Sequence, residues 1–315
     1  MRNAFAAEIT ALADVDPRVV LLSGDIGNRL FDKFKERHPA RFFNCGVAEA
    51  NMITMGAGMA RTGLRPVAYT IAPFITARVI EQIRVDLCYH NLGVTFVGVG
   101  AGLGYSELGP THHSCEDVAM LRALPNLTVL APADAPEVRS GLRAVLAHDG
   151  PVYMRIGKKG EPVIHPEPPP FTIGRVIPLR EGEDVCLVST GAILKDVLEA
   201  ADRLTVEDGL SVRVVSMPTI KPLDTAFLAD AFARHRVVTT VEEHSLIGGL
   251  GSALAEWLVD QAPQRAALCR VGGKDTFLKV CAELHTARAL LGMSVDDMVE
   301  RTRAVLARTS AGVAR

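Results

Sequence analysis

Residues 18–25 read RVVLLSGD, a run in which apolar side chains follow one another without alternating with polar ones. Such a run is typical of a strand in a parallel sheet that is buried on both faces. Similar runs occur at residues 65–71, 93–100, 126–134 and 151–157. Amphipathic stretches with helical spacing separate them, at residues 49–62, 73–90, 116–124 and 135–148. The pattern predicts an α/β fold with helices on both faces of a mostly parallel sheet.

The same alternation restarts after a proline-rich stretch. Residues 157–171 read GKKGEPVIHPEPPPF, with five prolines and little periodicity, which indicates an extended linker. Further strand-like runs lie at residues 184–191, 210–217, 236–244 and 266–273, and helical patterns at 194–207, 252–262 and 294–307. The sequence therefore predicts two doubly wound domains, residues 1–165 and 173–315, joined by a linker at residues 166–172.

Composition narrows the class of protein. The 315 residues carry a formal net charge of −2, which gives no reason to expect nucleic acid or an anionic membrane as a partner. No apolar run reaches the ~18 residues of a spanning helix. Glu8, Asp14 and Asp16 interrupt the first apolar stretch, which argues against a signal peptide. The six cysteines form no CxxC pair, so we expect a cytoplasmic protein without zinc or disulfides.

Familiar nucleotide and metal motifs are missing from the sequence. No stretch fits G-x-G-x-x-G, the P-loop or H-E-x-x-H. Residues 98–117 nevertheless form a Gly-rich stretch after a predicted strand, and they end with His112 and His113 before a predicted helix. A long loop of this kind on an α/β scaffold is more often functional than not.

Two other positions suggest chemistry. Glu49 opens a helix of small and apolar residues, where it could simply favour the N-terminal dipole. If that helix is buried, the Glu49 carboxyl is desolvated, which suits a proton-handling role. Phe74 follows a predicted strand end, where a ring could be core or could stack on a ligand. Arg78 and Arg84 follow on the same predicted helix, and a solvated or interfacial face explains them without a site.

Five segments, in order, resemble the pyrimidine-binding and C-terminal domains of transketolase-like, thiamine-diphosphate-dependent enzymes. They are G-V-A-E-A-N-M (46–52), F-x-x-x-R-x-x-E-Q-I-R (74–84), G-P-T-H-H-S-x-E-D (109–117), L-P-N-L-T-V-L-x-P-A-D (124–134) and V-E-E-H-S-x-x-G-G-L-G-S (241–252). The resemblance covers nearly the whole chain, and implies that residues 1–165 bind the pyrimidine and residues 173–315 form the C-terminal-like domain.

The family's diphosphate-binding domain carries a G-D-G…N motif that holds Mg²⁺, and no G-D-G occurs in this sequence. The resemblance therefore implies the C-terminal subunit of a split enzyme. An N-terminal transketolase-like subunit would complete the binding site for thiamine diphosphate and Mg²⁺, in an α2β2 heterotetramer. The implied reaction transfers a two-carbon ketol unit from a small sugar or 2-oxo donor to an aldehyde.

The resemblance also implies roles for single residues. Glu49 would pair with N1′ of the aminopyrimidine, Phe74 would stack on its ring, and Ile71 stands where a second aromatic is common. His112 stands at the position of the family's histidine, which implies that it contacts the substrate. A sugar phosphate would be bound by Arg155, with Arg2 as a second such group.

Two departures from the family pattern bear on the donor. Leu108 stands where the family normally has an Asp that contacts a donor hydroxyl, and Gly100 replaces a frequent histidine. We therefore expect a modified sugar or a 2-oxo acid rather than an ordinary pentose phosphate. The β subunit of a 2-oxo-acid dehydrogenase and a non-catalytic stabilising partner stay open as alternatives, although the Pro-Thr-His-His segment favours the transferase.

Overall fold

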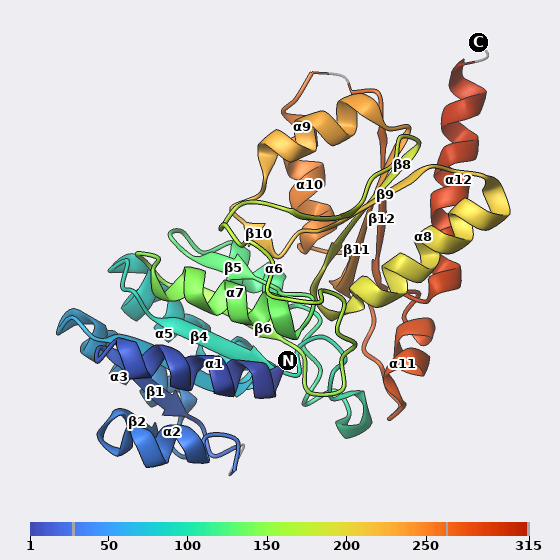
Figure 1. Cartoon of the computed structure of the whole chain (residues 1–315). Coiled ribbons are helices and arrows are strands. Elements are labelled where there is room, and N and C mark those ends of the chain that lie inside the picture. Colours follow the sequence, from blue (N-terminus) through green and yellow to red (C-terminus); the bar gives the residue numbers. More distant parts are fainter. Residues whose placement is uncertain (27–28, 263, 314–315) are drawn as a thin grey trace.

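The computed structural model describes residues 1–26, 29–262 and 264–313, so the remaining positions of the two predicted domains lie outside the described residues. The chain forms two mostly parallel sheets with helices on both faces, as the sequence predicts, and Figure 1 shows them as two lobes. The seven-stranded sheet has the order β10-β5-β6-β4-β3-β1-β2, and the five-stranded sheet has the order β12-β11-β8-β9-β7.

The first sheet is built by strands that bury both faces. Its strands are β1 (Val19–Ser23), β2 (Phe42–Asn44), β3 (Arg65–Ile71), β4 (Thr95–Val99), β5 (Thr128–Leu130), β6 (Val152–Ile156) and β10 (Thr219–Lys221). Along β1, Val19 and Leu21 join one apolar cluster, whereas Val20 and Leu22 join the other. Because side chains alternate between the faces of a strand, the uninterrupted apolar run is what a sheet covered on both faces needs.

Helices cover the two faces of this sheet. Helices α1 (Arg2–Val15) and α7 (Ala135–Leu146) pack together on one face, with Phe5 and Leu142 in its cluster. Helix α3 (Glu49–Arg61) and the segment after β3 supply Met52 and Ile83 to the other cluster. Short helices α2 (Asp32–Arg37) and α6 (Asp117–Arg122) complete the lobe.

The second sheet repeats the arrangement. Its strands are β7 (Ile177–Arg180), β8 (Val185–Thr190), β9 (Val212–Ser216), β11 (Val237–Ser245) and β12 (Ala267–Gly273). Its helices are α8 (Leu194–Asp208), α9 (Thr225–Arg234), α10 (Leu250–Val259), α11 (Leu284–Leu290) and α12 (Val295–Val313). Figure 1 shows α8 and α12 on one side of this sheet and α9 and α10 on the other.

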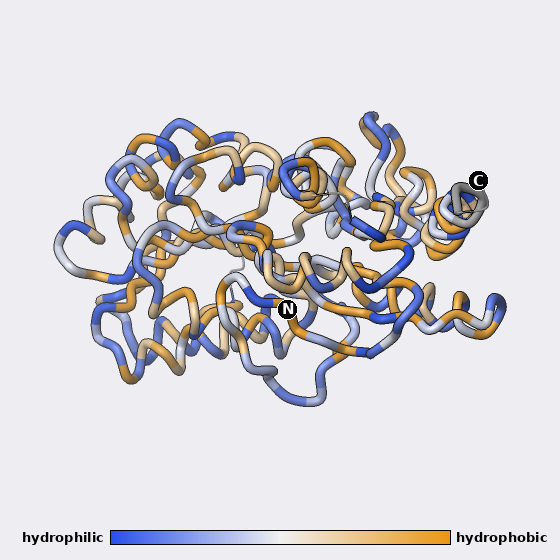
Figure 2. Tube along the Cα trace, turned by 90° about the horizontal axis from the view of Figure 1, so that it is seen from above, coloured by the Kyte–Doolittle hydropathy of each residue, from blue (hydrophilic) through white to orange (hydrophobic). Residues whose placement is uncertain are grey.

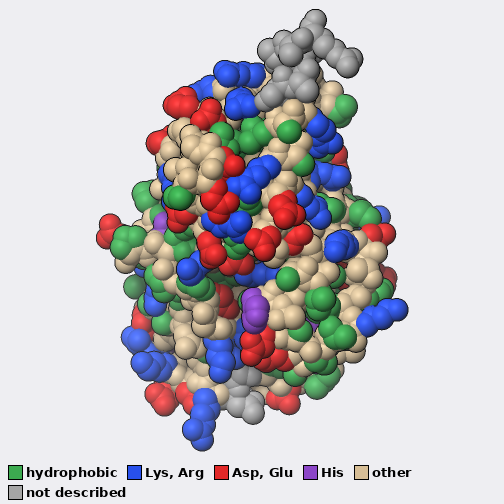
Figure 3. Space-filling model, turned by 90° about the vertical axis from the view of Figure 1, so that its right-hand side faces the viewer, with side chains coloured by type: hydrophobic (Ala, Val, Ile, Leu, Met, Phe, Trp, Pro, Cys, Tyr) green, Lys and Arg blue, Asp and Glu red, His purple; other side chains and the backbone are tan. Residues whose placement is uncertain are grey.

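Polar side chains cover the outside of the second lobe. Figure 3 looks onto the side that carries α8 and α12, where acidic and basic side chains are interspersed. Arg203 on α8 pairs with Asp296 on α12, and Arg303 on α12 pairs with Glu207. Figure 2 shows that many peripheral turns are hydrophilic. None of the helices in the described part of the chain combines the length and apolarity that crossing a membrane requires.

Three short strands, and helices α1, α2, α9 and α11, lie outside the stretches predicted from the sequence. Strands β2, β7 and β10 lie in stretches not predicted as strands, because three or four residues give too little periodicity to recognise. Strand β10 comes from the second predicted domain but pairs antiparallel with β5, so it completes the edge of the first sheet. The two predicted domains therefore share a sheet.

The predicted helix at residues 73–90 is interrupted. It comprises α4 (Ala72–Ile75), a 3-10 turn (Ala77–Val79), α5 (Ile80–Gln82) and a π-helical segment (Ile83–Tyr89). Thr76 leaves the helical region, with φ −118° and ψ −82°, and its hydroxyl donates to the carbonyl of Ala72. Threonine side chains that hydrogen-bond the preceding turn compete with a regular helix, and π-helical turns recur at functional sites.

The proline-rich stretch is fixed to the first lobe. Asp134 caps α7 by accepting from the N–H of Glu137, and its other oxygen accepts from the N–H groups of Ile164 and His165. The His165 ring lies 3.1 Å from Asp134 and 3.7 Å from the buried Glu137 carboxylate. Residues 164–165 are therefore held by hydrogen bonds rather than left free.

This contact predicts a pH-dependent stability. Burial raises the pKa of Glu137 to about 7 from 4.5, so between these values the folded chain retains a proton that the unfolded chain loses. Burial disfavours protonation of His165, but Asp134 and Glu137 outweigh it and raise its pKa, which acts in the same direction at higher pH. The free energy of unfolding should therefore fall as the pH rises from 5 to 8, by on the order of 3 kcal/mol for Glu137.

Urea unfolding at several pH values measures this slope. Glu137→Gln keeps the shape of the side chain and should flatten the decline, whereas the control Glu167→Gln changes an exposed linker residue and should keep it. Equal slopes in both variants would contradict the assignment to Glu137.

Candidate active site

The first part of the site is the start of α3. Glu49 is the first residue of this helix, and its side chain is only 5% exposed. Met52 and Ile53, one turn later, are fully buried and fix the helix against the sheet. Gly46, with φ +68°, makes the turn that leads into the helix. The carboxylate of Glu49 is thus held in a largely water-excluded place, as the sequence predicts.

Arg78 is the partner of this carboxylate. Its Nη1 donates to Oε2 of Glu49 over 3.1 Å, and its guanidinium carbon lies 4.3 Å from the centre of the Phe74 ring. The break at Thr76 allows the segment to place Phe74 and Arg78 together beside α3. No sequence pattern predicts this pairing of Arg78 with Glu49, because the two lie 29 residues apart on different elements.

His112 joins the same cluster from the Gly-rich loop. Its ring lies 5.3 Å from that of Phe74 and 6.0 Å from that of Tyr105, in edge-on geometry. Thr111 contacts Nδ1 of His112 through its hydroxyl, at 3.0 Å. Burial, and secondly the neighbouring His113, lower the pKa of His112. The imidazole is therefore held in its neutral form near neutral pH, able to both accept and donate a hydrogen bond.

Tyr105 explains the glycine at position 100. A Cβ on Gly100 would lie 2.0 Å from the Tyr105 ring, so no side chain fits there while this ring is in place. Lys158 lies 4.8 Å above the same ring, and the Arg2 guanidinium lies close enough to lower the pKa of Tyr105 against the larger effect of burial, which raises it. Tyr105 is thus a site residue that the motifs did not identify.

The remaining predicted residues lie at different depths. Ile71 ends β3 and belongs to the buried apolar cluster against which Phe74 packs, so it lies beneath the candidate site. Arg2 is the first residue of α1 and lies beside Tyr105. Leu108 ends a 3-10 turn (Ser106–Leu108) in the loop, with 53% of its surface exposed. The structure thus places Arg2 at the edge of the candidate site, beside Tyr105.

The expectation that Arg155 binds a sugar phosphate is not supported. The side chain is buried, its Nε donates to Asp117 over 2.9 Å, and Nη2 donates to the carbonyls of Ser114 and Glu243. Nε and Nη2, which form one edge of the guanidinium, are therefore engaged within the protein, and burial leaves little of the side chain accessible to a phosphate. Arg155 instead joins the loop, α6 and β11.

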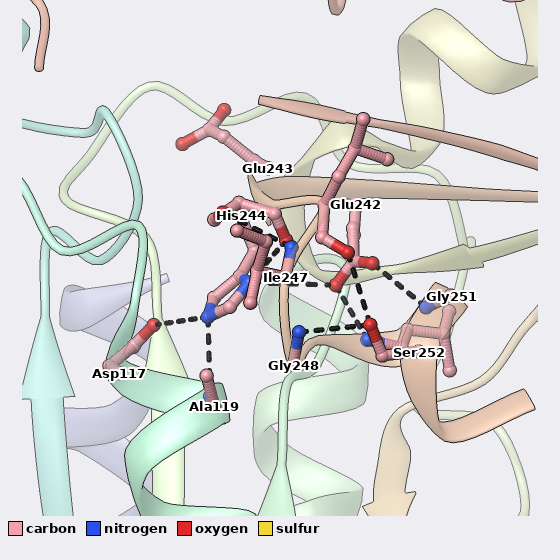
Figure 4. Close-up of polar contacts among 12 residues, drawn as sticks. Asp117, Ala119, Glu242, Glu243, His244, Ile247, Gly248, Gly251 and Ser252 are labelled. Atoms are coloured by element: carbon pink, nitrogen blue, oxygen red, sulfur yellow. Dashed lines mark hydrogen bonds and ion pairs between the residues drawn. The ribbon is translucent and has the colours of Figure 1, made fainter. Parts of the chain in front are cut away.

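A polar network ties the start of α6 to the second lobe (Figure 4). Nδ1 of His244 lies 2.8 Å from the carbonyl of Ser245, so it carries the proton, and Nε2 accepts from the N–H of Ala119. Glu242 accepts from the N–H groups of Leu250 and Gly251 at the start of α10. The V-E-E-H-S segment therefore joins the two lobes and also caps a helix.

Glu243 acts on the Gly-rich loop directly. Its carboxylate accepts from the N–H of Leu103 over 2.7 Å and from Nε of Arg288 over 2.6 Å. A Cβ on Gly102 would lie 2.3 Å from this carboxylate. Gly100 and Gly102 thus allow Tyr105 and Glu243 to pack closely against the loop. A bound phosphate is not required to explain these glycines.

Together these groups form the candidate site. A buried carboxylate, an aromatic face and a neutral imidazole come from the segments that follow β2, β3 and β4. Within the described residues, no group of three His, Cys, Asp or Glu side chains could hold a metal ion. The site can bind a planar ligand and share a proton with it.

Comparison with known proteins identifies the family of the chain. The transketolase pyrimidine-binding domain model matches residues 1–161, and the transketolase C-terminal domain model matches residues 174–298. An uncharacterised transketolase family protein of Sinorhizobium fredii is 38% identical over 95% of this chain and 87% of its own length. A 6-deoxy-6-sulfo-D-fructose transketolase subunit of Clostridium sp. is 36% identical over 89% of this chain and 86% of its own.

A solved structure gives the same result. The chain of a split gene transketolase, described as an inactive β4 tetramer, is 35% identical, with a TM-score of 0.87 over 97% of each chain. The two family models, the two relatives and the solved structure thus all indicate the same family. The chain belongs to the transketolase family, as a subunit with the pyrimidine-binding and C-terminal domains.

Proposed function

We propose that this chain supplies the pyrimidine half of the active site in a split transketolase-like transferase, with Glu49 as its proton-handling residue. Membership of the family implies thiamine diphosphate as the cofactor. The observation that carries the proposal is the contact of one planar group, the Arg78 guanidinium, with both Glu49 and Phe74. The two residues are spaced to receive a planar nitrogen base.

The residues of the chain then have distinct tasks. Glu49 shares a proton with N1′ of the aminopyrimidine, and its burial strengthens this hydrogen bond. Phe74 offers the ring face, and Ile71 supports it from the core. When bound, thiamine diphosphate supplies a nucleophilic carbon for transfer of a two-carbon ketol unit. His112 is neutral and stands next to Phe74, where it contacts the substrate carbonyl or hydroxyl groups.

The donor is proposed to carry an anionic group. Arg2 and Lys158 lie around Tyr105 at the edge of the candidate site. Lys158 already pairs with Glu107 over 3.6 Å, so Arg2 is the group that would attract such a donor. Arg155 is likewise bound within the protein. Leu108 cannot accept a hydrogen bond from a donor hydroxyl. The relative from Clostridium sp. is named for a sulfonated sugar, which supports a modified anionic sugar as the donor class.

We further propose that residues 1–165 and 173–315 act as the two functional domains, completed by a partner. An N-terminal subunit with the G-D-G…N motif would hold Mg²⁺ and the diphosphate in an α2β2 assembly. The subunit relative and the inactive β4 assembly of the split transketolase support this arrangement.

The purified chain alone should therefore show no ketol transfer and bind thiamine diphosphate weakly, because it offers only the pyrimidine contacts. Adding an N-terminal subunit encoded in the same genome should restore both. Calorimetric titration and a coupled transfer assay, each with and without that subunit, measure the effect. Full turnover and tight cofactor binding by the chain alone would refute the proposal.

A further inference from the structure

Arg78 contacts both groups to which the aminopyrimidine is assigned. Its Nη1 lies 3.1 Å from Oε2 of Glu49, and its guanidinium carbon lies 4.3 Å from the centre of the Phe74 ring. A guanidinium is planar, positively charged and rich in N–H donors. An aminopyrimidine that shares a proton with Glu49 at N1′ and stacks on Phe74 would use the same two contacts, so the two groups compete for one place.

The pairing also has a physical reason. The Glu49 side chain is 5% exposed, and a buried carboxylate without a partner is strongly unfavourable. Arg78 provides the opposite charge, while 48% of its own side chain stays exposed. Because this side chain is half in solvent and follows the break at Thr76, it can move outward without opening the core.

We infer that Arg78 is a positioning residue that holds Glu49 and Phe74 in place of the aminopyrimidine and is displaced when the cofactor binds. The inference rests on the proposed function of Glu49 and Phe74. Only the molecules in which Arg78 has moved away from Glu49 and Phe74 can bind the cofactor. The apparent affinity for the cofactor is therefore the intrinsic affinity multiplied by the fraction of molecules in that state.

The test uses the enzyme assembled with its N-terminal subunit and thiamine diphosphate with Mg²⁺ as the probe. Arg78→Met keeps the length of the side chain but can neither pair with Glu49 nor offer a planar group. Calorimetric titration should show roughly tenfold tighter binding for Arg78→Met than for the wild type. Arg84→Met is the matched control, because Arg84 is exposed on the same segment, and its affinity should equal the wild-type value.

Two further variants separate competition from a general effect. In a Glu49→Gln background the gain from Arg78→Met should shrink, because a neutral amide no longer holds Arg78 by charge. Arg78→Lys keeps the charge and loses the planar fork, so it should show a smaller gain than Arg78→Met. It also preserves a partner for Glu49, so it tests the inference if Arg78→Met fails to fold by circular dichroism.

The outcomes are distinct. Tighter binding by Arg78→Met, with a reduced gain beside Gln at position 49, supports the inference. Equal or weaker binding by Arg78→Met and Arg78→Lys, when the wild-type assembly binds the cofactor, overturns the inference and leaves the proposed function intact. A wild-type assembly that binds no thiamine diphosphate overturns the proposed function and the inference with it.

Discussion

Glu49→Gln in the assembled enzyme should slow exchange of the cofactor's C2 proton by roughly 10²- to 10⁴-fold, the usual contribution of one positioned acid–base group. The amide has the shape of the carboxyl, but it cannot share a proton with N1′ as a carboxylate does. The buried place at the start of α3 should remain folded, because Met52 and Ile53 fix the helix independently of this side chain. Quenched hydrogen–deuterium exchange, followed by NMR, measures the rate.

A matched substitution distinguishes this role from a general change of charge. Glu81→Gln removes a carboxylate from an exposed position on the segment that carries Phe74, and its exchange rate should equal that of the wild type. Near-normal exchange in Glu49→Gln would remove Glu49 from the proton transfer.

The fold is largely predictable from local sequence. Consecutive apolar residues at positions 19–22 already require two covered faces, and the structure divides these residues between two clusters. Strand β10 is different, because its place beside β5 depends on a contact between segments about 90 residues apart. No local pattern encodes such a pairing, so periodicity gives the layers but not every edge of a sheet.

The sequence can indicate residues of the candidate site, but it does not indicate their partners in the fold. Motif order indicated Glu49, Phe74 and His112, and the structure gathers them. The contact of Arg78 with Glu49 is not predictable from the sequence, because the spacing of Arg78 fits a solvated helix, whereas the interruption at Thr76 redirects it. Arg155 presents the opposite difficulty, since a motif position suggests an anion site but does not show that protein groups already accept hydrogen bonds from Nε and Nη2.

Arg155→Met should lower the free energy of unfolding by about 3–5 kcal/mol, the usual cost of removing one member of a buried ion pair. Asp117 is fully buried and would lose its charged partner. Its Oδ2 would keep only the hydrogen bond from the Tyr153 hydroxyl. The carbonyls of Ser114 and Glu243 would also lose a donor. Urea unfolding followed by circular dichroism measures the loss.

Controls decide between a structural role and substrate binding for Arg155. Arg303→Met breaks a surface ion pair and should change stability little. Asp117→Asn combined with Arg155→Met should recover part of the loss, because the buried charge is then removed on both sides. If Arg155→Met keeps wild-type stability and selectively weakens anionic donors, Arg155 binds substrate. Loss of stability with the same relative activity toward anionic and neutral donors in the folded protein assigns Arg155 to the join between the lobes, where Ser114 and Glu243 meet.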